Sequence, residues 1–274
     1  MPLVIRLRTK NAIPLEVDSI RLETVRSQTV DQVKATAVHF GNKTPTLGEF
    51  FDVSGSAADD GHIIWEGDCS QVKLIGANLQ CGRVTVEGNA GMHVGAEMTG
   101  GEVEVRGNAG DWVGAEMKGG RIRVRGNTGH CVGAVYRGGR RGMTGGEILI
   151  DGDAGNEIGH TMRRGLIAVR GKAGDAVGFS MLAGSVFLFG SAGIRHGAGM
   201  RRGTIAFFGD EPAPPLLPTF RFACSYQPTI LRTYLLHLRK VGFDVAESCL
   251  TATYRRFNGD FLELGKGEIL IRAK

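Results

Sequence analysis

The sequence lacks the features that mark membrane proteins and secreted proteins. No apolar run approaches the roughly 18 residues that a membrane-spanning helix needs. The first residues, MPLVIRLRTK, scatter charges among apolar side chains, which is not the pattern of a signal peptide. We therefore expect a cytoplasmic protein that has no contact with a membrane.

Paired cysteines are also missing. The chain has five cysteines at wide, unmatched spacings: Cys69, Cys81, Cys131, Cys224 and Cys249. There is no CxxC pair and no paired Cys/His array, so neither a zinc ribbon nor a disulfide framework is indicated. The five cysteines are interpreted as free thiols, and no metal site is predicted.

Motifs of common catalytic sites are absent as well. The seven histidines show no HxH or HExxH spacing, and there is no G-x-S-x-G motif, Ser-His-Asp order or nucleotide fingerprint. Glu97 and Glu116 are spaced as an acid/base pair on adjacent repeats would be, but without a nearby nucleophile they are interpreted as a solvated turn. No catalytic residue is predicted. The net charge of +5 favours acidic partners without predicting nucleic-acid binding.

Glycine is what the sequence has in excess, with 43 of 274 residues, about twice the ordinary share. A glycine closes each hydrophobic stretch, at Gly88, Gly107, Gly126, Gly152, Gly171, Gly190 and Gly209. The steps are 19, 19, 26, 19, 19 and 19, and the long step holds an insertion from Tyr136 to Gly142. A fixed period of this size predicts a solenoid of stacked units.

Each repeat carries a short stretch of alternating β-branched residues. Two inward columns result: Val84, Val103, Ile122, Ile148, Ile167, Val186 and Ile205, then Val86, Val105, Val124, Ile150, Val169, Leu188 and Phe207. Two more columns hold Val94, Val113, Val132, Ile158 and Val177, and six methionines from Met98 to Met200. Alternation of this kind indicates strands. The fold class is therefore all-β, a parallel β-helix of about seven coils with small terminal caps.

The glycines are interpreted as corners of this β-helix. One column runs from Gly91 to Gly193 and another from Gly95 to Gly197, because glycine adopts positive φ without steric cost and lets stacked backbones approach. A phosphate-binding loop would need one such turn opening a helix, not six alike. His196 takes the place of an apolar residue in one column and is interpreted as a hydrogen-bonded histidine near the core.

The repeated G-x-x-G-x-x-x-G pattern, for example Gly88, Gly91 and Gly95, resembles a known domain. That domain is shared by the C-terminal part of large glutamate synthase subunits and by the C subunit of formylmethanofuran dehydrogenase. The flanks, with TPTLGEFFDVSG, are most similar to this C subunit, especially in formyltransferase/hydrolase complexes of methylotrophic bacteria. The resemblance implies a right-handed β-helix without catalytic residues, built into a hetero-oligomeric complex. That complex moves a formyl group between tetrahydromethanopterin and a methanofuran-type carrier and releases formate.

Three segments are expected. Residues 1–64 form an N-terminal cap with strands at LVIRLR and SIRLETV and a helix at VDQVKATAV. Residues 65–211 form the β-helix. Residues 212–274 form a proline-rich connection, a helix with Leu231, Leu235 and Leu238 on one face, a hairpin turning at Asn258-Gly259, and a last strand at GEILIRA.

Basic residues gather on one edge of the predicted solenoid. Lys118, Arg163, Arg164, Arg201 and Arg202 follow the methionine column, and the insertion adds Arg137, Arg140 and Arg141. This basic edge is either a solvated face or a groove for a polyanion. The resemblance adds that methanofuran-type carriers have glutamate-rich tails, which such a strip would hold by charge-assisted bonds. No other cofactor is predicted for this chain.

The outward strand positions are polar in the early repeats and apolar in the late ones. The apolar members include Leu149, Phe187, Phe189 and Phe208. An apolar outer face must be covered, either by the chain's own C-terminal segment or by another protein of a complex. We favour an interface with a partner here, because the family that this chain resembles serves as a scaffold.

Three functions agree with these features. The first is a non-catalytic structural subunit of a formyltransferase/hydrolase complex. The second is a stand-alone β-helix enzyme or binding module that acts on an acidic polymer along the basic edge. The third is a coupling domain of the glutamate synthase type, which would require fused amidotransferase and flavin domains that 274 residues do not contain.

Overall fold

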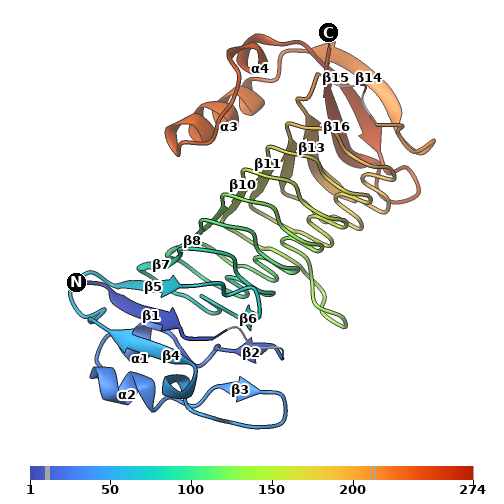
Figure 1. Cartoon of the computed structure of the whole chain (residues 1–274). Helices are drawn as coiled ribbons and strands as arrows, with labels where there is room; N and C mark the ends of the chain where they lie inside the picture. Colours follow the sequence, from blue (N-terminus) through green and yellow to red (C-terminus); the bar gives the residue numbers. More distant parts are fainter. Residues whose placement is uncertain (10–12, 211, 213, 274) are drawn as a thin grey trace.

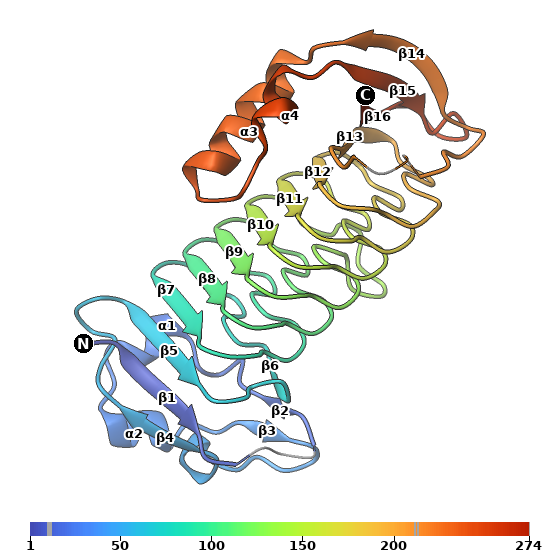
Figure 2. The same cartoon turned by 45° about the horizontal axis from the view of Figure 1, so that its top comes forward.

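A long, mostly parallel sheet runs through the whole protein (Figure 1). The structure is a computed structural model, and it describes residues 1–9, 13–210, 212 and 214–273. Eight stacked strands form the middle of the sheet: β5 (His62–Glu66), β7 (Arg83–Val86), β8 (Glu102–Val105), β9 (Arg121–Val124), β10 (Glu147–Ile150), β11 (Leu166–Val169), β12 (Ser185–Leu188) and β13 (Arg202–Phe207). Between them the chain loops back over the same face each time (Figure 2). The mostly β, β-helix-like fold predicted from the repeats is confirmed.

The strands pair in the register that the repeats predict. Val105 is the parallel partner of Val124, and Val124 is the partner of Ile150. All three side chains are fully buried, and so are the methionines of the repeat, from Met98 to Met200. One continuous apolar core therefore fills the stack from end to end.

The two glycine columns serve different physical needs. Gly95 has a φ of +62°, a conformation that strains other residues. Gly91 is not in that region, but a Cβ there would lie 2.5 Å from the carbonyl oxygen of Val72. Backbone direction therefore requires glycine at Gly95, whereas the close approach of one unit to the previous one requires it at Gly91.

Side chains also bond the units to one another. The Asn89 Oδ1 accepts the backbone N–H of Asn108 at 2.9 Å, and the Asn108 Oδ1 accepts the N–H of Asn127 at 2.8 Å. The Asn127 Oδ1 continues the series to the N–H of Asp153 at 2.8 Å. These bonds satisfy backbone donors at a corner where no strand partner is present.

The N-terminal segment extends the sheet beyond β5. It contains β1 (Leu3–Leu7), β2 (Leu15–Glu16), α1 (Leu22–Val25), α2 (Val30–Lys34), β3 (His39–Phe40), the 3-10 turn η1 (Leu47–Glu49) and β4 (Phe51–Ser54). The short strand β6 (Val72–Lys73) follows β5 in the chain. Strand β1 pairs with β5 and β4, and β2, β3 and β6 form a small second sheet. The predicted strand at SIRLETV is wrong, because Leu22 and Val25 are buried on one face of a short helix.

The C-terminal segment contains β14 (Arg221–Tyr226), α3 (Thr229–Lys240), α4 (Glu247–Thr251), β15 (Tyr254–Gly259) and β16 (Lys266–Arg272). The predicted helix and last strand are confirmed. The predicted turn at Asn258-Gly259 is wrong, because both residues continue the pairing of β15 with β16. The chain reverses after them, where the Asp260 carboxylate accepts the N–H of Leu262 and of Gly199, both at 2.9 Å.

The chain covers its own apolar outer face. Helices α3 and α4 lie over the outward side of the late strands (Figure 1). Their buried residues form one cluster with Leu149, Phe187 and Phe208, and Phe189 packs against that cluster. The preference for a partner at these four residues is therefore wrong, since Leu231, Leu235 and Leu238 of α3 supply the cover.

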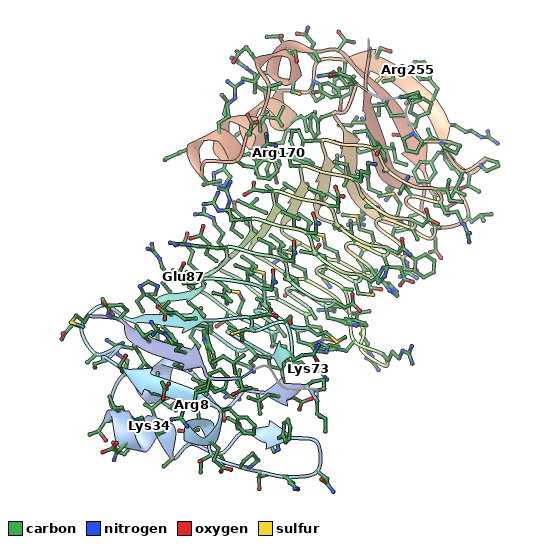
Figure 3. All side chains as sticks on the ribbon, in the orientation of Figure 1. Arg8, Lys34, Lys73, Glu87, Arg170 and Arg255 are labelled. Atoms are coloured by element: carbon green, nitrogen blue, oxygen red, sulfur yellow. The ribbon has the colours of Figure 1, made fainter. Side chains whose placement is uncertain are left out.

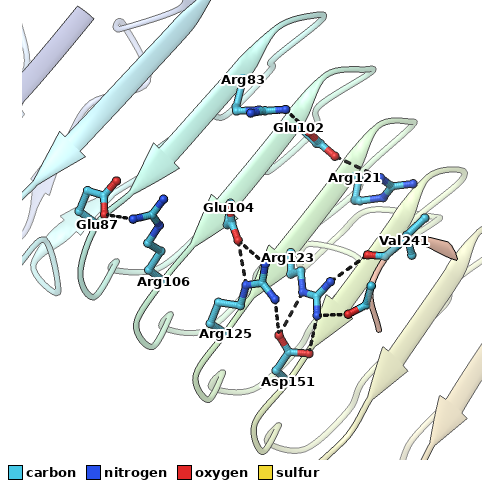
Figure 4. Close-up of polar contacts among 11 residues, drawn as sticks. Arg83, Glu87, Glu102, Glu104, Arg106, Arg121, Arg123, Arg125, Asp151 and Val241 are labelled. Carbon is cyan, nitrogen blue, oxygen red and sulfur yellow. Dashed lines mark hydrogen bonds and ion pairs between the residues drawn. The ribbon is translucent and has the colours of Figure 1, made fainter. Parts of the chain in front are cut away.

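Polar contacts attach α3 to the stack. Arg123 bonds Asp151 through two nitrogens at 3.0 Å and also donates to the carbonyls of Val241 and Gly242 at 3.0 and 2.8 Å (Figure 4). His237 of α3 contacts Glu147 at the start of β10. The helix is thus held against strands that lie far from it in sequence.

Candidate functional site

An open groove of about 850 Å³ lies at the N-terminal ends of the late strands β10 to β13, beside α3. Its lining includes five of the eight basic residues predicted for the edge: Arg141, Arg163, Arg164, Arg201 and Arg202. Gly165 and Gly184 contribute to the lining next to these arginines, and Tyr234 of α3 contributes from the helix. The repeat columns therefore do bring arginines of different units into one groove, with Leu182 and Ala183 of the intervening unit between the two pairs.

Three predicted basic residues are not part of the groove lining. Lys118 lies beside Glu97, with 3.4 Å between its Nζ and the Glu97 Oε2. Arg137 and Arg140 are exposed on the insertion. The insertion begins with Tyr136, whose ring stacks on Trp112 with centroids 5.3 Å apart, so its first residues are held over the loops of earlier repeats.

A second, shallower hollow continues along the earlier strands. It is lined by Gly101, Gly120 and neighbouring residues, and it shares Glu147 with the groove. In this half, arginines and carboxylates alternate: Glu102 lies 3.2 Å from Arg83 and 3.1 Å from Arg121 (Figure 4). Arg121 in turn lies 3.0 Å from Glu147. The positive charge of the early strands is therefore neutralised within the chain.

The arginines of the groove lack such partners. Among the residues that the structure describes, only Arg201 has a carboxylate, at 3.1 Å from Glu263, whereas Arg141, Arg163, Arg164 and Arg202 have none. Like charges that share one groove repel unless anions lie between them. The late half of the edge thus presents an uncompensated row of guanidinium groups.

The glycines of the lining add donors to this row. Within the described residues, the backbone N–H groups of Gly165 and Gly184 have no hydrogen-bond acceptor. Both residues have positive φ, near +105°, and no side chain to shield the backbone. Unpaired N–H groups beside arginines are a typical environment for anions such as carboxylates.

The family of this chain follows from comparison with known proteins. The GXGXG motif family matches residues 71–214, more than half of the sequence. The chain belongs to the GXGXG family. The matched residues include β6, the stacked strands from β7 to β13 and both halves of the edge described above.

Curated relatives of this GXGXG chain include the C subunits of formylmethanofuran dehydrogenases. That of the tungsten-containing formylmethanofuran dehydrogenase 2 of Methanothermobacter marburgensis is 38% identical over 85 residues, 30% of this chain and 32% of that protein. That of the molybdenum-containing formylmethanofuran dehydrogenase 1 of the same organism is 41% identical over 82 residues, 30% of this chain and 20% of that protein. The matched part spans a third or less of these two relatives.

A solved structure is similar to the GXGXG chain over its full length. It is a chain in the X-ray crystal structure of the formyltransferase/hydrolase complex (FhcABCD) from Methylorubrum extorquens in complex with methylofuran. The TM-score is 0.90 at 30% sequence identity, and the match covers 99% of this chain and 100% of that chain. The similarity therefore extends to both terminal segments as well as to the stacked strands.

Carboxylates and histidines of the GXGXG repeats are engaged in structural contacts. The Glu116 Oε1 accepts the N–H of Tyr136 at 3.1 Å, and Glu97 pairs with Lys118. His93 contacts the Tyr136 hydroxyl at 3.0 Å. In the described part of the chain, no group of three or more His, Cys, Asp or Glu side chains could hold a metal ion. No helix there is long and apolar enough to cross a membrane.

His196 is buried and hydrogen-bonded, as predicted. It is 2% exposed, its Nδ1 accepts the N–H of Val177 at 3.3 Å, and its Nε2 lies 2.9 Å from the Gly193 carbonyl oxygen. This arrangement requires a neutral ring with the proton on Nε2. Burial lowers the pKa of His196 below its usual value of 6.5.

Stability is expected to fall in weak acid because of His196. A histidine whose folded-state pKa is depressed stabilises the protein above its unfolded pKa, and this stability is lost as the pH falls toward the folded pKa. Lowering the pH from about 7.5 to about 5.5, through the usual histidine pKa, should therefore lower the free energy of unfolding. In urea titrations, His196→Gln should show a smaller pH slope than wild type, whereas the exposed control His39→Gln should not. Equal slopes in all three proteins would contradict the assignment.

Proposed function

We propose that this chain is the non-catalytic structural C subunit of a formyltransferase/hydrolase complex. The complex would convert formyl-tetrahydromethanopterin to formate through a formyl-methanofuran-type carrier, with other subunits as partners. The full-length similarity to a chain of such a complex, at a TM-score of 0.90, supports this proposal. The three-segment division and a right-handed β-helix of about seven coils with 19-residue repeats are part of it.

The groove is proposed to hold the acidic tail of the carrier. The observation that supports this step is that Arg163, Arg164 and Arg202 of the groove have no carboxylate partners among the described residues. In the early half of the same edge, by contrast, Arg83 and Arg121 are paired with Glu102 and Glu147. Arg164 and Arg202 lie two units apart, and stacked strands are about 4.8 Å apart, so the two arginines can meet carboxylates roughly 10 Å apart on an extended chain. A guanidinium grips a carboxylate through two nitrogens, which an ammonium cannot do. Arg163, Arg164 and Arg202 are the central residues of this site.

Removing these arginines should release the carrier. Each exposed contact contributes about 1 kcal/mol or less, so the triple change of Arg163, Arg164 and Arg202 to serine should weaken binding by roughly 10- to 100-fold. The measurement is carrier retained by the purified complex at low salt, by mass spectrometry. Arg83→Ser with Arg106→Ser, which removes arginines already paired with Glu102 and Glu87, is the control.

Salt provides an independent check of the same site. The Debye length shortens from about 10 Å at 0.1 M to about 3 Å at 1 M, so wild-type retention should fall toward that of the triple variant. If wild type and the triple variant retain equal amounts of carrier at low salt, the groove does not bind the carrier and is only a solvated face.

A second candidate function rests on the same groove. An open arginine-lined groove would also accept another acidic polymer, as a stand-alone binding module or enzyme would require. Purified chain without partner subunits distinguishes the two. Turnover or tight binding of polyglutamate by the isolated chain favours the second function, whereas binding seen only in the assembled complex favours the first.

A further inference from the structure

The sheet does not end where the stacked units end. After β13 it continues through β16 and β15 to β14, which forms one edge of the sheet (Figures 1 and 2). Five of the six residues of β14 are exposed. The opposite edge is different, because α2 and η1 pack beside β4 there and Phe51 of β4 is fully buried. The chain therefore shields one end of its sheet and leaves the other end open.

The side chains that face the core in the stacked strands have exposed counterparts at this open end of the sheet. Ile205 pairs with Ile269, Ile269 with Phe257, and Phe257 with Phe222. The two isoleucines are fully buried, whereas Phe222 is 55% exposed. Phe220 still belongs to the apolar core, whereas the ring of Phe222, two residues later, lies outside it.

Two arginines lie over aromatic rings at this end of the sheet, where Phe222 and Phe261 are exposed and Phe257 is half-buried. The Arg255 Cζ is 5.2 Å from the Phe257 centroid and 5.9 Å from the Phe222 centroid, at the C-terminal end of the molecule (Figure 3). The Arg221 Cζ is 5.6 Å from the ring of Phe261. Neither arginine has a carboxylate partner among the described residues. Arginine stacked on aromatic rings, with its nitrogens free, is a typical composition of protein interfaces.

We propose that these residues form a docking surface for an acidic, extended segment of a partner subunit. We use the name terminal patch for the free edge of β14 with the side chains on either side of it: Phe222, Arg255 and Phe257 on one face of the sheet and Arg221 on the other. The proposal rests on the proposed function, since it requires a complex. Carboxylates of the segment would pair with the two arginines, its apolar side chains would cover the rings, and its backbone would bond the edge of β14.

A second copy of the same chain does not fit the terminal patch. In a symmetric pair the same patch faces itself, so arginines would meet arginines without a carboxylate between them. The pairing of β14 with β15 shifts register between Phe222 and Cys224, which restricts an added strand to a few residues. The side chains must therefore supply most of the specificity, and their charge selects an acidic partner.

The test is assembly of the complex from co-expressed subunits of one organism. Combining Phe222→Ser with Arg255→Glu should lower the amount of chain that co-purifies with its partners at least tenfold, while the melting temperature of the isolated chain stays unchanged. The control is Phe179→Ser, which changes a phenylalanine of similar exposure, 39%, that packs edge-on against His160 on a loop of the stack. The control should assemble like wild type.

Hydrogen exchange of the wild type gives a measurement that does not depend on the variant's folding. Within Cys224 to Tyr226, the amides that point away from β15 should be protected in the complex and exchange quickly in the isolated chain. Wild-type assembly by the double variant, an equal loss in the control, or unchanged exchange in β14 would each overturn the terminal patch. Failure of the wild type to assemble at all would instead overturn the proposed function, and the patch with it.

Discussion

Replacing Val124 with aspartate is expected to lower the free energy of unfolding by about 4 kcal/mol or more. Val124 is fully buried between Val105 and Ile150 on the adjacent strands. Losing its apolar burial costs about 1.5–3 kcal/mol, and a carboxylate there would be buried without a partner. Urea titration of the isolated chain measures the change.

The matched control introduces the same charge where water reaches it. Thr99 is exposed on a loop of the stack, so Thr99→Asp should change the unfolding free energy by about 0.5 kcal/mol or less. If Val124→Asp and Thr99→Asp unfold at the same urea concentration, the inward assignment of this column is wrong.

Truncating Phe187 to alanine is expected to destabilise the isolated chain by roughly 3–5 kcal/mol. Its ring is 1% exposed and packs edge-on against Phe208 and Tyr234, with centroids 5.4 and 5.6 Å apart. Since Tyr234 belongs to α3, the change opens a cavity under the chain's own helix. Phe222→Ala, at an exposed ring, should leave the stability of the isolated chain nearly unchanged.

The outcome distinguishes the two covers that the sequence allows for the apolar outer face. A loss of stability in the isolated chain agrees with the self-covered face. If Phe187→Ala left the melting temperature unchanged but prevented assembly, Phe187 would instead be a contact with a partner protein. Differential scanning fluorimetry and gel filtration of the two variants give both readings.

The repeating part of the fold could be predicted because each position is sampled several times. The inward column that contains Val105 and Val124 shows the same β-branched chemistry in successive units, so chance patterns cancel. The flanks occur once. At Leu22–Val25 the spacing of apolar residues fits a strand or a short helix, and burial on one side selected the helix. Asn258-Gly259 carries a turn signal that the pairing of β15 with β16 overrides.

The basic edge was predictable only as far as the repeat extends. Arg163 and Arg201 occupy one repeat column and Arg164 and Arg202 the next, and the structure brings all four into one groove. The position of Arg137 depends on where Tyr136 stacks, a contact between loops that no column records. The lack of carboxylate partners could not be predicted either, because it depends on which side chains reach one another across the strands.

The contact of Arg123 with the end of α3 affects how cooperatively the protein unfolds. In a simple stack each unit touches only its neighbours, so units can detach from an end one at a time. Arg123 on β9 bonds the carbonyls of Val241 and Gly242, while the same segment packs on Phe187 and Phe208 farther along. Unfolding of any strand from β9 to β13 therefore disrupts the packing of α3 and the residues after it, which contact all of these strands. The late units are coupled into one cooperative block, whereas the early units, which α3 does not cover, are stabilised by their neighbours and by the N-terminal segment.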